Sequence, residues 1–303
     1  MQVHLVDGTY ELFRYFYAVP RYQVNGTEVG AARAVVRAMV GMLEDGCSHV
    51  AVATDHVIES FRNDIFRGYK SGDGIDPDLW GQFPLLERGL EALGITTWPM
   101  VEFEADDALA TAAALAADDT RVTRVLIATP DKDLAQCVVD DRVVQHDRRR
   151  DLVRTEQDVI DRFGVPPDSI PDFLALVGDA ADCIPGIPGW GEKSTARVLA
   201  RYRKIGMIPE SAVDWDLNVR GAVRLADALS QNLDDALLYR QLTELRRDVP
   251  VLADGVDALQ WRGPGADLHG VCAELGATDV PERMARLISR SIPSVSQGQS
   301  RNR

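Results

Sequence analysis

The chain has 303 residues, 46% of them hydrophobic and 26% charged, and its net charge is −14. This composition supports a folded core and leaves room for one large domain or two modest ones. No apolar run approaches the roughly 20 residues of a membrane-spanning helix, which excludes proteins built on such helices. The acidic balance also argues against tight, unspecific binding of nucleic acid, because polyanions favour basic partners.

The N-terminal residues and the cysteines both indicate a cytoplasmic protein. The start, Met1-Gln2-Val3-His4-Leu5-Val6-Asp7, has no basic region, so we expect no signal peptide. The four cysteines lie far apart in apolar surroundings and form no CxxC pattern; they are Cys47, Cys137, Cys183 and Cys272. We expect buried thiols in a reducing compartment.

The first half of the chain alternates short apolar runs with helix-like stretches. Strands are predicted at Val3–Val6, Val50–Thr54, Ile95–Trp98, Val125–Ala128 and Val143–Gln145. Helices are predicted at Ala31–Leu43, at about 78–93 and at Glu104–Ala117. This alternation predicts an α/β fold with a parallel sheet and helices on both of its faces.

From about Thr155 the pattern becomes wholly helical. Helices are predicted at Thr155–Phe163, which opens with a capping box, at Ser169–Val177, at Gly191–Tyr202 and at about 219–246. We place a domain boundary near Arg154, which gives domains at 1–154 and 155–290. Residues 291–303 are rich in Ser, Gln, Asn and Arg and are predicted to be a disordered tail.

Nine carboxylates recur in short groups along the first 182 residues. Asp7 and Asp55 each follow a predicted strand directly, and Asp131 lies just beyond a third strand. Ligands of open α/β sheets bind at the carboxyl ends of strands, so we expect these three side chains to converge in one crevice. The full set is Asp7, Asp55, Glu104, Asp106, Asp107, Asp131, Asp133, Asp179 and Asp182.

The type and spacing of these carboxylates point to divalent metal ions. Glu104 and Asp107, and again Asp179 and Asp182, have the three-residue spacing of one helix face. Oxygen ligands without His or Cys favour Mg²⁺ or Mn²⁺ over zinc. A set of this size suits two ions about 3.5–4 Å apart, which promote in-line phosphoryl displacement. Any single carboxylate has a structural alternative as a helix cap, so spacing alone predicts only a metal-dependent phosphate enzyme.

A glycine-rich segment follows directly after Asp182. The run Gly186-Ile187-Pro188-Gly189-Trp190-Gly191-Glu192-Lys193-Ser194 is expected to form a tight hairpin between two helices. Glycines let a backbone approach a phosphate closely, and the N–H groups at a helix start favour an anion. The alternative is a plain helix–helix connection, which also favours Gly and Pro. The basic helix that follows favours a clamp for a nucleic-acid backbone.

Motifs along the chain come in the order seen in the flap endonuclease/5′–3′ exonuclease family. They are Val6-Asp7-Gly8, Ser60-Phe61-Arg62, Gly68-Tyr69-Lys70, Glu104-Ala105-Asp106-Asp107, Ala128–Leu134 and Gly178–Lys193. To about residue 290 the chain resembles this family and is similar to the nuclease domain of bacterial DNA polymerase I. No polymerase domain follows in this sequence, so a free-standing form is expected. The resemblance implies a PIN-like parallel sheet flanked by helices, with a helical helix–three-turn–helix DNA-binding subdomain.

The resemblance also implies roles for individual residues. One metal site would consist of Asp7, Asp55, Glu104 and Asp106, with Asp107 close by, and the second of Asp131, Asp133, Asp179 and Asp182. Lys70 matches a lysine that reaches the scissile phosphate, Arg62 is its basic companion, and Arg14 matches an arginine on the first helix. The hairpin would hold duplex DNA through Gly186, Gly189, Gly191, Lys193 and Ser194, and K⁺ through the carbonyls of Ile184, Gly186 and Ile187. A helical arch, at about 56–85, would thread or clamp the single-stranded 5′ end.

The sequence departs from the family pattern at three places. Asp73 stands where the family usually has an arginine, three residues after the arch lysine. The arch region is also poor in basic residues, with Asp76 and Asp78 close by. Trp190 takes a place that is usually held by a small aliphatic residue. The first departure replaces a phosphate ligand by a negative charge, so cleavage is expected to be slower or the arch differently arranged.

The implied activity is that of a structure-specific 5′ nuclease in DNA replication and repair, leaving 5′-phosphate and 3′-hydroxyl ends. Expected substrates are DNA with 5′ flaps, nicks, gaps or recessed ends, and RNA in RNA–DNA hybrids. The protein is expected to be a nucleoid-associated monomer without a membrane partner. Two alternatives stay open: a catalytically weak or inactive DNA-structure-binding protein, and a PIN-type ribonuclease. The balance of exonuclease and endonuclease activity and the choice between Mg²⁺ and Mn²⁺ stay open as well.

Overall fold

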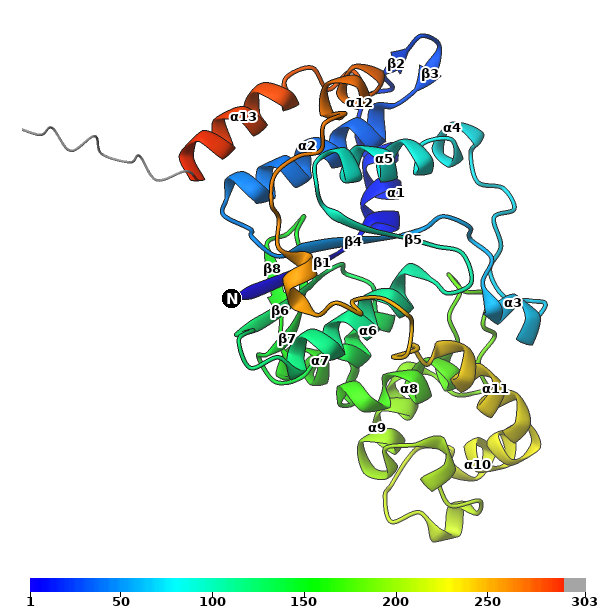
Figure 1. Ribbon diagram of the computed structural model, residues 1–303. Coiled ribbons are helices and arrows are strands. Elements are labelled where there is room, and N and C mark those ends of the chain that lie inside the picture. Colours follow the sequence, from blue (N-terminus) through cyan, green and yellow to red (C-terminus); the bar gives the residue numbers. More distant parts are fainter. Residues whose placement is uncertain (292–303) are drawn as a thin grey trace, which may run out of the picture.

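The computed structural model describes residues 1–291, so the tail predicted at 291–303 lies outside the described residues, except for residue 291. The α/β part is built around a central sheet, and a helical part lies beside the α/β part (Figure 1). None of the helices within residues 1–291 is both long and apolar enough to cross a bilayer. The predicted combination of a parallel α/β sheet and a helical subdomain is therefore confirmed.

Six strands form the central sheet. They are β1 (Gln2–Asp7), β4 (Val50–Asp55), β5 (Thr96–Met100), β6 (Arg124–Ala128), β7 (Val143–Asp147) and β8 (Leu152–Arg154). Their order is β5-β4-β1-β6-β7-β8, and every pair is parallel except β7 with β8. Because β1 lies between β4 and β6, the carboxyl ends of these three strands meet at one edge. The short antiparallel strand β8 is too brief to show a sequence period.

Helices cover both faces of this sheet. The α/β part contains α1 (Gly8–Ala18), α2 (Gly30–Glu44), α3 (Phe61–Ile65), α4 (Pro77–Trp80), α5 (Phe83–Ala92), α6 (Ala105–Asp118), α12 (Leu268–Glu274), α13 (Val280–Ser291) and the hairpin β2 (Gln23–Val24) to β3 (Thr27–Glu28). Alternate residues of β1 point to opposite faces, as a strand requires. Val6 packs with α1, α2 and α5, whereas Val3 and Leu5 pack with α6.

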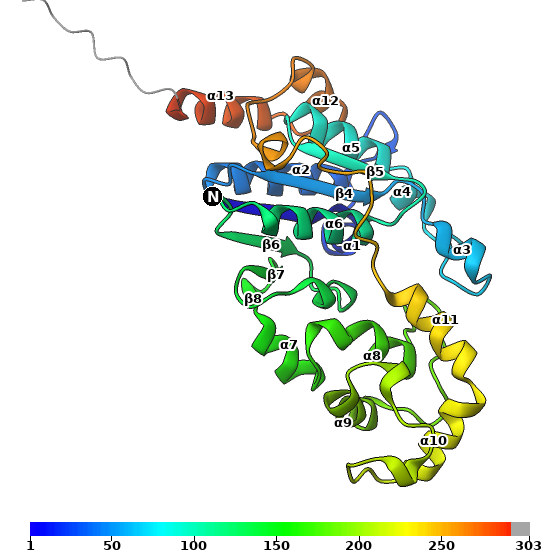
Figure 2. The same cartoon turned by 60° about the horizontal axis from the view of Figure 1, so that its bottom comes forward.

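The helical part has a core of its own. It contains α7 (Glu156–Phe163), α8 (Ile170–Val177), α9 (Glu192–Tyr202), α10 (Ala222–Gln231) and α11 (Leu233–Thr243). Figure 2 shows α11 at the side of this part that leads back towards the sheet. Trp190 is 4% exposed in this core; its indole N–H donates to the Leu225 carbonyl (3.0 Å), and its ring lies 6.2 Å from that of Trp215. Trp190 therefore fills core volume where the family usually has a small aliphatic residue.

Three sequence-based expectations need correction. The helix predicted at about 78–93 is interrupted between α4 and α5, because Pro84 in the first turn of α5 has no N–H to continue a helix. The helix predicted at about 219–246 is likewise divided, at Asn232, into α10 and α11. Of the cysteines expected to be buried, Cys137 and Cys272 are buried and Cys47 is half-buried, but Cys183 is exposed.

Candidate active site

A cleft of about 250 Å³ lies where the carboxyl edge of the sheet meets the helical part. Both acidic and basic side chains line it. The lining residues are Lys70, Asp106, Pro130, Asp131, Lys132, Asp133, Arg162, Asp179, Ala181 and Asp182. The cleft therefore joins residues that are more than 100 positions apart in the sequence.

The first carboxylate group comprises Asp7, Asp55, Glu104 and Asp106. Asp7 ends β1 and caps α1, where it accepts hydrogen bonds from the Tyr10 N–H (2.8 Å) and the Thr129 hydroxyl (2.9 Å). Asp55 ends the neighbouring strand β4 and accepts from the Ala105 N–H at the start of α6 (2.7 Å). The strand ends and the helix start thus hold these side chains in fixed positions, as the sequence predicts for Asp7 and Asp55.

The second carboxylate group comprises Asp131, Asp133, Asp179 and Asp182. Asp131 follows β6, and its carboxylate accepts from the Asp133 N–H at 2.9 Å. Carboxylate oxygens of Asp133, Asp179 and Asp182 lie within 4.8 Å of one another, and all three residues are buried. Such a cluster of hard oxygen atoms has the chemistry of a divalent-cation site.

Asp179 and Asp182 do not share a helix face, in contrast to the prediction from their spacing. The helix α8 ends at Val177, and Gly178 (φ 90°) turns the chain. Asp179 and Ile184 then pair through two backbone hydrogen bonds, each 2.8 Å long. The two carboxylates therefore project from a tight turn, which places them next to Asp133 in the second carboxylate group.

Asp107 and Arg62 pair beneath the cleft, and neither lines it. The Arg62 guanidinium donates to both Asp107 oxygens (2.7 and 2.8 Å) and to the Leu242 carbonyl (2.7 Å). Arg62 is 1% exposed and Asp107 is fully buried. Arg62 also lies 3.3 Å from Glu104, so it supports a member of the first carboxylate group. This geometry departs from the expectation that Asp107 is a metal ligand and Arg62 a companion of Lys70 at the phosphate.

Two lysines form ion pairs with carboxylates in the cleft. Lys70 Nζ lies 2.9 Å from Glu104 and 3.0 Å from Asp182, so it spans the first and second carboxylate groups. Lys132 Nζ lies 2.7 Å from Asp179. Sequence reasoning singled out Lys70 but not Lys132, although its position between two aspartates offered a signal. Both ammonium groups therefore offset part of the negative charge in the cleft.

The carboxylates are costly to ionise together. Burial raises the pKa of Asp7 to about 7, and the nearby charges of Asp55 and Asp131 add to the effect. Burial and then the charge of Asp131 raise the pKa of both Asp106 and Asp133 well above the ordinary value. One buried oxygen of Asp133 has no hydrogen-bond partner within the described residues. Desolvated, mutually repelling oxygen donors with an unpartnered atom fit divalent cations.

We expect the metal-free protein to lose stability as the pH rises through the range in which Asp7 titrates. Its pKa rises from 3.8 to about 7, so between these values the native state binds a proton that the unfolded state has released. The Asp7 contribution to the free energy of unfolding should therefore fall across this window. Thermal melting in EDTA at about pH 5 and about pH 8 should show a smaller pH dependence for Asp7→Asn than for wild type. Equal pH dependence in both proteins would contradict the prediction.

Arg14 lies outside this arrangement. It pairs with the buried Glu11 on the same helix, and its guanidinium lies 4.1 Å from the centroid of the Tyr15 ring. Within residues 1–291 it makes no hydrogen bond or ion pair with either carboxylate group. The structure therefore does not bring Arg14 together with Lys70, and its expected role in catalysis stays a prediction.

The hairpin after α8 brings backbone segments unusually close together. Gly186 has φ 73°, and a Cβ atom there would lie 2.6 Å from backbone atoms of Val177 and Gly178. Gly189 and Gly191 instead face open space, beside the exposed Lys193 at the start of α9. The Ser194 hydroxyl accepts from the Gly191 N–H (3.2 Å) and so caps this helix. Of the residues predicted to clamp a backbone, Gly189, Gly191 and Lys193 are exposed, whereas Ser194 and Gly186 are partly buried.

We expect Gly186→Ala to destabilise the protein more than Gly189→Ala. Both glycines have positive φ, so each substitution should cost about 1 kcal/mol of backbone strain. Only at Gly186 does the added Cβ meet backbone atoms, which should add on the order of 1–3 kcal/mol. Urea unfolding of the two variants checks this difference, and equal losses would contradict it.

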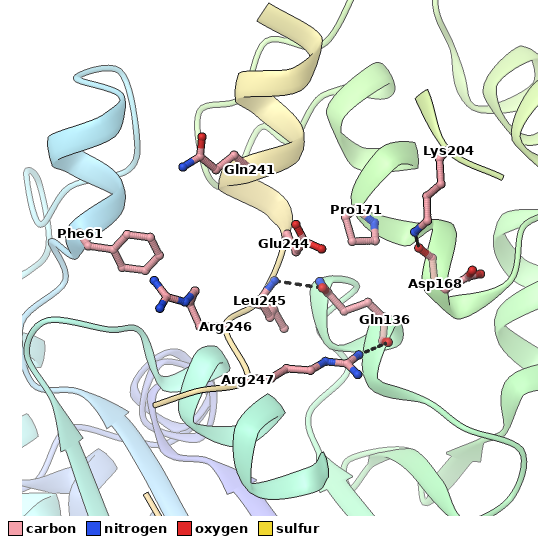
Figure 3. A pocket seen from close by; sticks show the side chains of 10 residues that line it. All are labelled: Phe61, Gln136, Asp168, Pro171, Lys204, Gln241, Glu244, Leu245, Arg246 and Arg247. Atoms are coloured by element: carbon pink, nitrogen blue, oxygen red, sulfur yellow. Dashed lines mark hydrogen bonds between the residues drawn. The ribbon is translucent and has the colours of Figure 1, made fainter. Parts of the chain in front are cut away.

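A larger cavity, of about 550 Å³, lies at the seam between the two parts (Figure 3). In it the Gln136 side chain donates to the Thr243 carbonyl (3.0 Å) and accepts from the Leu245 N–H (3.0 Å). The same side chain donates to the Asp133 carbonyl at 2.8 Å. Gln136 thus fixes the segment that carries Asp133 to the end of α11. No sequence pattern distinguishes this glutamine, because two of its three partners, Thr243 and Leu245, are over 100 residues away.

Two acidic residues at the start of α4 are partly neutralised by a single arginine. Arg21 lies 3.1 Å from Asp76 and 3.6 Å from Asp78, and it stacks on the Phe16 ring. Asp73 is exposed, and its carboxylate has no ion-pair partner within residues 1–291. The negative charge at the position where the family usually has an arginine is therefore presented to solvent.

Comparisons with known proteins agree with this architecture. The chain is 38% identical to DNA polymerase I of Mycobacterium tuberculosis (strain ATCC 25618 / H37Rv) over 304 residues, 97% of this chain and 33% of that protein. It is 30% identical to DNA polymerase I of Bacillus subtilis (strain 168) over 287 residues, 92% of this chain and 32% of that protein. The chain thus spans about a third of the length of these relatives.

Solved structures share the fold at low sequence identity. T5 5′-exonuclease with bound zinc ions has a TM-score of 0.65 and 17% identity, covering 86% of this chain and 96% of that chain. The catalytic core of Rad2 in complex with DNA substrate has a TM-score of 0.61 and 16% identity, and the match covers 94% of this chain and 92% of that chain.

Two family models match consecutive parts of the chain. The 5′–3′ exonuclease N-terminal resolvase-like domain matches residues 2–164, and the 5′–3′ exonuclease C-terminal SAM fold matches residues 165–267. The chain therefore belongs to the 5′–3′ exonuclease family, whose members are metal-dependent nucleases.

Proposed function

We propose that this chain is a structure-specific 5′ nuclease that hydrolyses DNA phosphodiesters with the help of two divalent ions. The observation that supports this most directly is the cleft, where Lys70 spans two carboxylate groups. A backbone hairpin with exposed glycines and Lys193 leads away from the same carboxylates. This combination suits a reaction on a phosphate that belongs to a duplex.

The donor set fits Mg²⁺ or Mn²⁺, because every donor is a carboxylate oxygen. The first carboxylate group would hold one ion and the second carboxylate group the other. When bound, such ions supply an activated water and neutralise charge on the phosphate oxygens. Lys70 would contact the scissile phosphate and offset its developing charge. Arg62 and Asp107 would hold Glu104 in place from beneath.

The hairpin at 184–194 would grip the duplex backbone and leave the base sequence unread, since backbone contacts carry no sequence information. Carbonyl groups of Gly186 and Ile187 would hold K⁺ there; that of Ile184 already accepts the Asp179 N–H. Residues at about 56–85 would clamp the single-stranded 5′ end. We place the division between the catalytic and clamping parts near Arg154.

The proposed substrates are 5′ flaps, nicks, gaps or recessed ends of DNA, and RNA paired with DNA. The protein would act as a monomer in the cytoplasm, at the nucleoid. A comparison of three 5′-labelled molecules tests the substrate class: a flap duplex, the same strand alone, and a single-stranded RNA. We expect the flap duplex to be cut fastest with Mg²⁺ or Mn²⁺. Faster cutting of the single-stranded RNA would instead favour a PIN-type ribonuclease.

A further inference from the structure

Arg162 is the one cation lining the cleft that no carboxylate pairs with, among the residues that the structure describes. Lys70 and Lys132, the other two basic residues there, both form ion pairs with members of the carboxylate groups. The Arg162 guanidinium instead lies 4.7 Å from the centroid of the neighbouring Phe163 ring, and its side chain is exposed on α7. Its hydrogen-bond donors are therefore free to bind an anion in the cleft.

Two further arginines, Arg150 and Arg154, lie close enough to repel Arg162, although neither lines the cleft. Arg150 and Arg154 share a single carboxylate, Asp147, at 3.7 and 3.9 Å. One buried nitrogen of Arg154 has no hydrogen-bond partner within residues 1–291. Partial burial and then repulsion by Arg154 lower the pKa of Arg162, while the Asp131 charge opposes this effect. The cleft thus combines a set of carboxylates with the positive charge around Arg162.

This combination of charges matches the two needs of a phosphodiester substrate. One phosphate must meet the metal-binding carboxylates, and a neighbouring phosphate on the same strand needs a separate cation. Asp73 cannot supply that cation from the loop after Lys70. An arginine can, because its planar guanidinium donates two parallel hydrogen bonds to one phosphate.

We propose that Arg162 binds a phosphate of the substrate strand in the cleft, and that it supplies from the helical part the contact that Asp73 cannot make. This inference rests on the proposed nuclease function. It makes Arg162, on α7 of the helical part, a substrate-binding residue of the same site.

The test compares Arg162→Gln with Arg162→Lys and with a matched control, Arg88→Gln. Arg88 is an exposed arginine on α5 that pairs with Glu274, and it does not line the cleft. Binding of the flap duplex is measured in EDTA by fluorescence anisotropy over a range of salt concentrations, and cleavage is measured with Mg²⁺. For Arg162→Gln we expect kcat/KM to fall about 10- to 100-fold, as for loss of one charge-assisted hydrogen bond.

The salt dependence separates phosphate binding from a merely structural role. In Arg162→Gln the slope of log affinity against log salt should become shallower by about 1, which is the effect of one lost phosphate contact. Arg162→Lys keeps the charge, so it should keep the slope, but it should recover the cleavage rate only in part because an ammonium group cannot donate the two parallel hydrogen bonds. Arg88→Gln should behave as wild type in both measurements.

Three results would count against the inference or its basis. An active wild type with an unchanged slope and kcat/KM in Arg162→Gln would overturn it and leave the nuclease function intact. Tighter binding of Mn²⁺ by Arg162→Gln with an unchanged slope would also overturn it, because Arg162 would then only balance the charge of the carboxylates. A wild type that binds the flap but does not cut it would refute the nuclease function. Even then, a shallower slope of log affinity against log salt in Arg162→Gln would show that Arg162 contacts a phosphate.

Discussion

Asp133→Asn is expected to abolish metal-dependent cleavage and, in the same protein, to stabilise the metal-free fold. Asp133 is 7% exposed, one of its oxygens has no hydrogen-bond partner within the described residues, and its pKa lies well above the ordinary value. Burial is the main cause, and repulsion by Asp131 and Asp182 adds to it. Asparagine keeps the shape and removes the charge, so both the repulsion and the metal affinity should decrease.

The two effects have different sizes and different measurements. Cleavage of a flap duplex should fall by about 10³-fold or more, the loss of several kcal/mol of transition-state stabilisation. The melting temperature in EDTA at about pH 8 should rise by roughly 2–4 °C for each kcal/mol of relieved repulsion. Asp118→Asn, a change of an exposed aspartate at the end of α6, should alter neither quantity. A less stable Asp133→Asn that still cuts would contradict the assignment of Asp133 to the metal-binding carboxylates.

Arg62→Met is expected to lower the free energy of unfolding by roughly 3–5 kcal/mol, because it leaves the fully buried Asp107 charge without its partner. The same guanidinium donates to the Leu242 carbonyl and lies beside Glu104, so α3, α6 and the end of α11 lose a common anchor. Urea unfolding measures the loss. Arg62→Lys should not restore stability, since an ammonium group cannot reproduce the bidentate pair.

A double substitution separates this anchoring role from direct catalysis. Arg62→Met combined with Asp107→Leu removes both buried charges, so it should be more stable than Arg62→Met alone. An Arg62→Met protein with wild-type stability and no cleavage would contradict the anchoring role and place Arg62 at the reacting phosphate.

The convergence of distant carboxylates was predictable because it follows from sheet topology. Asp7, Asp55 and Asp131 lie at or just beyond the ends of β1, β4 and β6, respectively. These strands are neighbours in the sheet, and parallel neighbours end at the same edge. The capping box before α7 was predictable for a similar reason, since its four residues are consecutive. Features that depend on nearby residues or on strand direction can therefore be predicted from the sequence.

Orientation within a short motif was less predictable. Glu104 and Asp107 were expected to face one metal site, yet Glu104 is the N-cap of α6 and Asp107, three residues later, turns inward to Arg62. The pair between Arg62 and Asp107 forms because α3 lies next to α6, and no local spacing reveals that contact. Arg162 and Gln136 went unnoticed for the same reason, because their surroundings form only when the helical part folds back against the sheet.

Cleavage of a 5′-labelled flap duplex with Mg²⁺ or Mn²⁺, comparing wild type with Asp131→Ala and Asp179→Ala, tests the two-metal nuclease most directly. The two residues lie on different elements, after β6 and after α8, so a shared defect would come from the site that they form together. We expect metal-dependent cutting near the flap junction by the wild type and its loss in both variants, with binding of the duplex retained in EDTA. A wild type that binds the flap but cuts it with neither metal would contradict the account and leave a DNA-structure-binding protein.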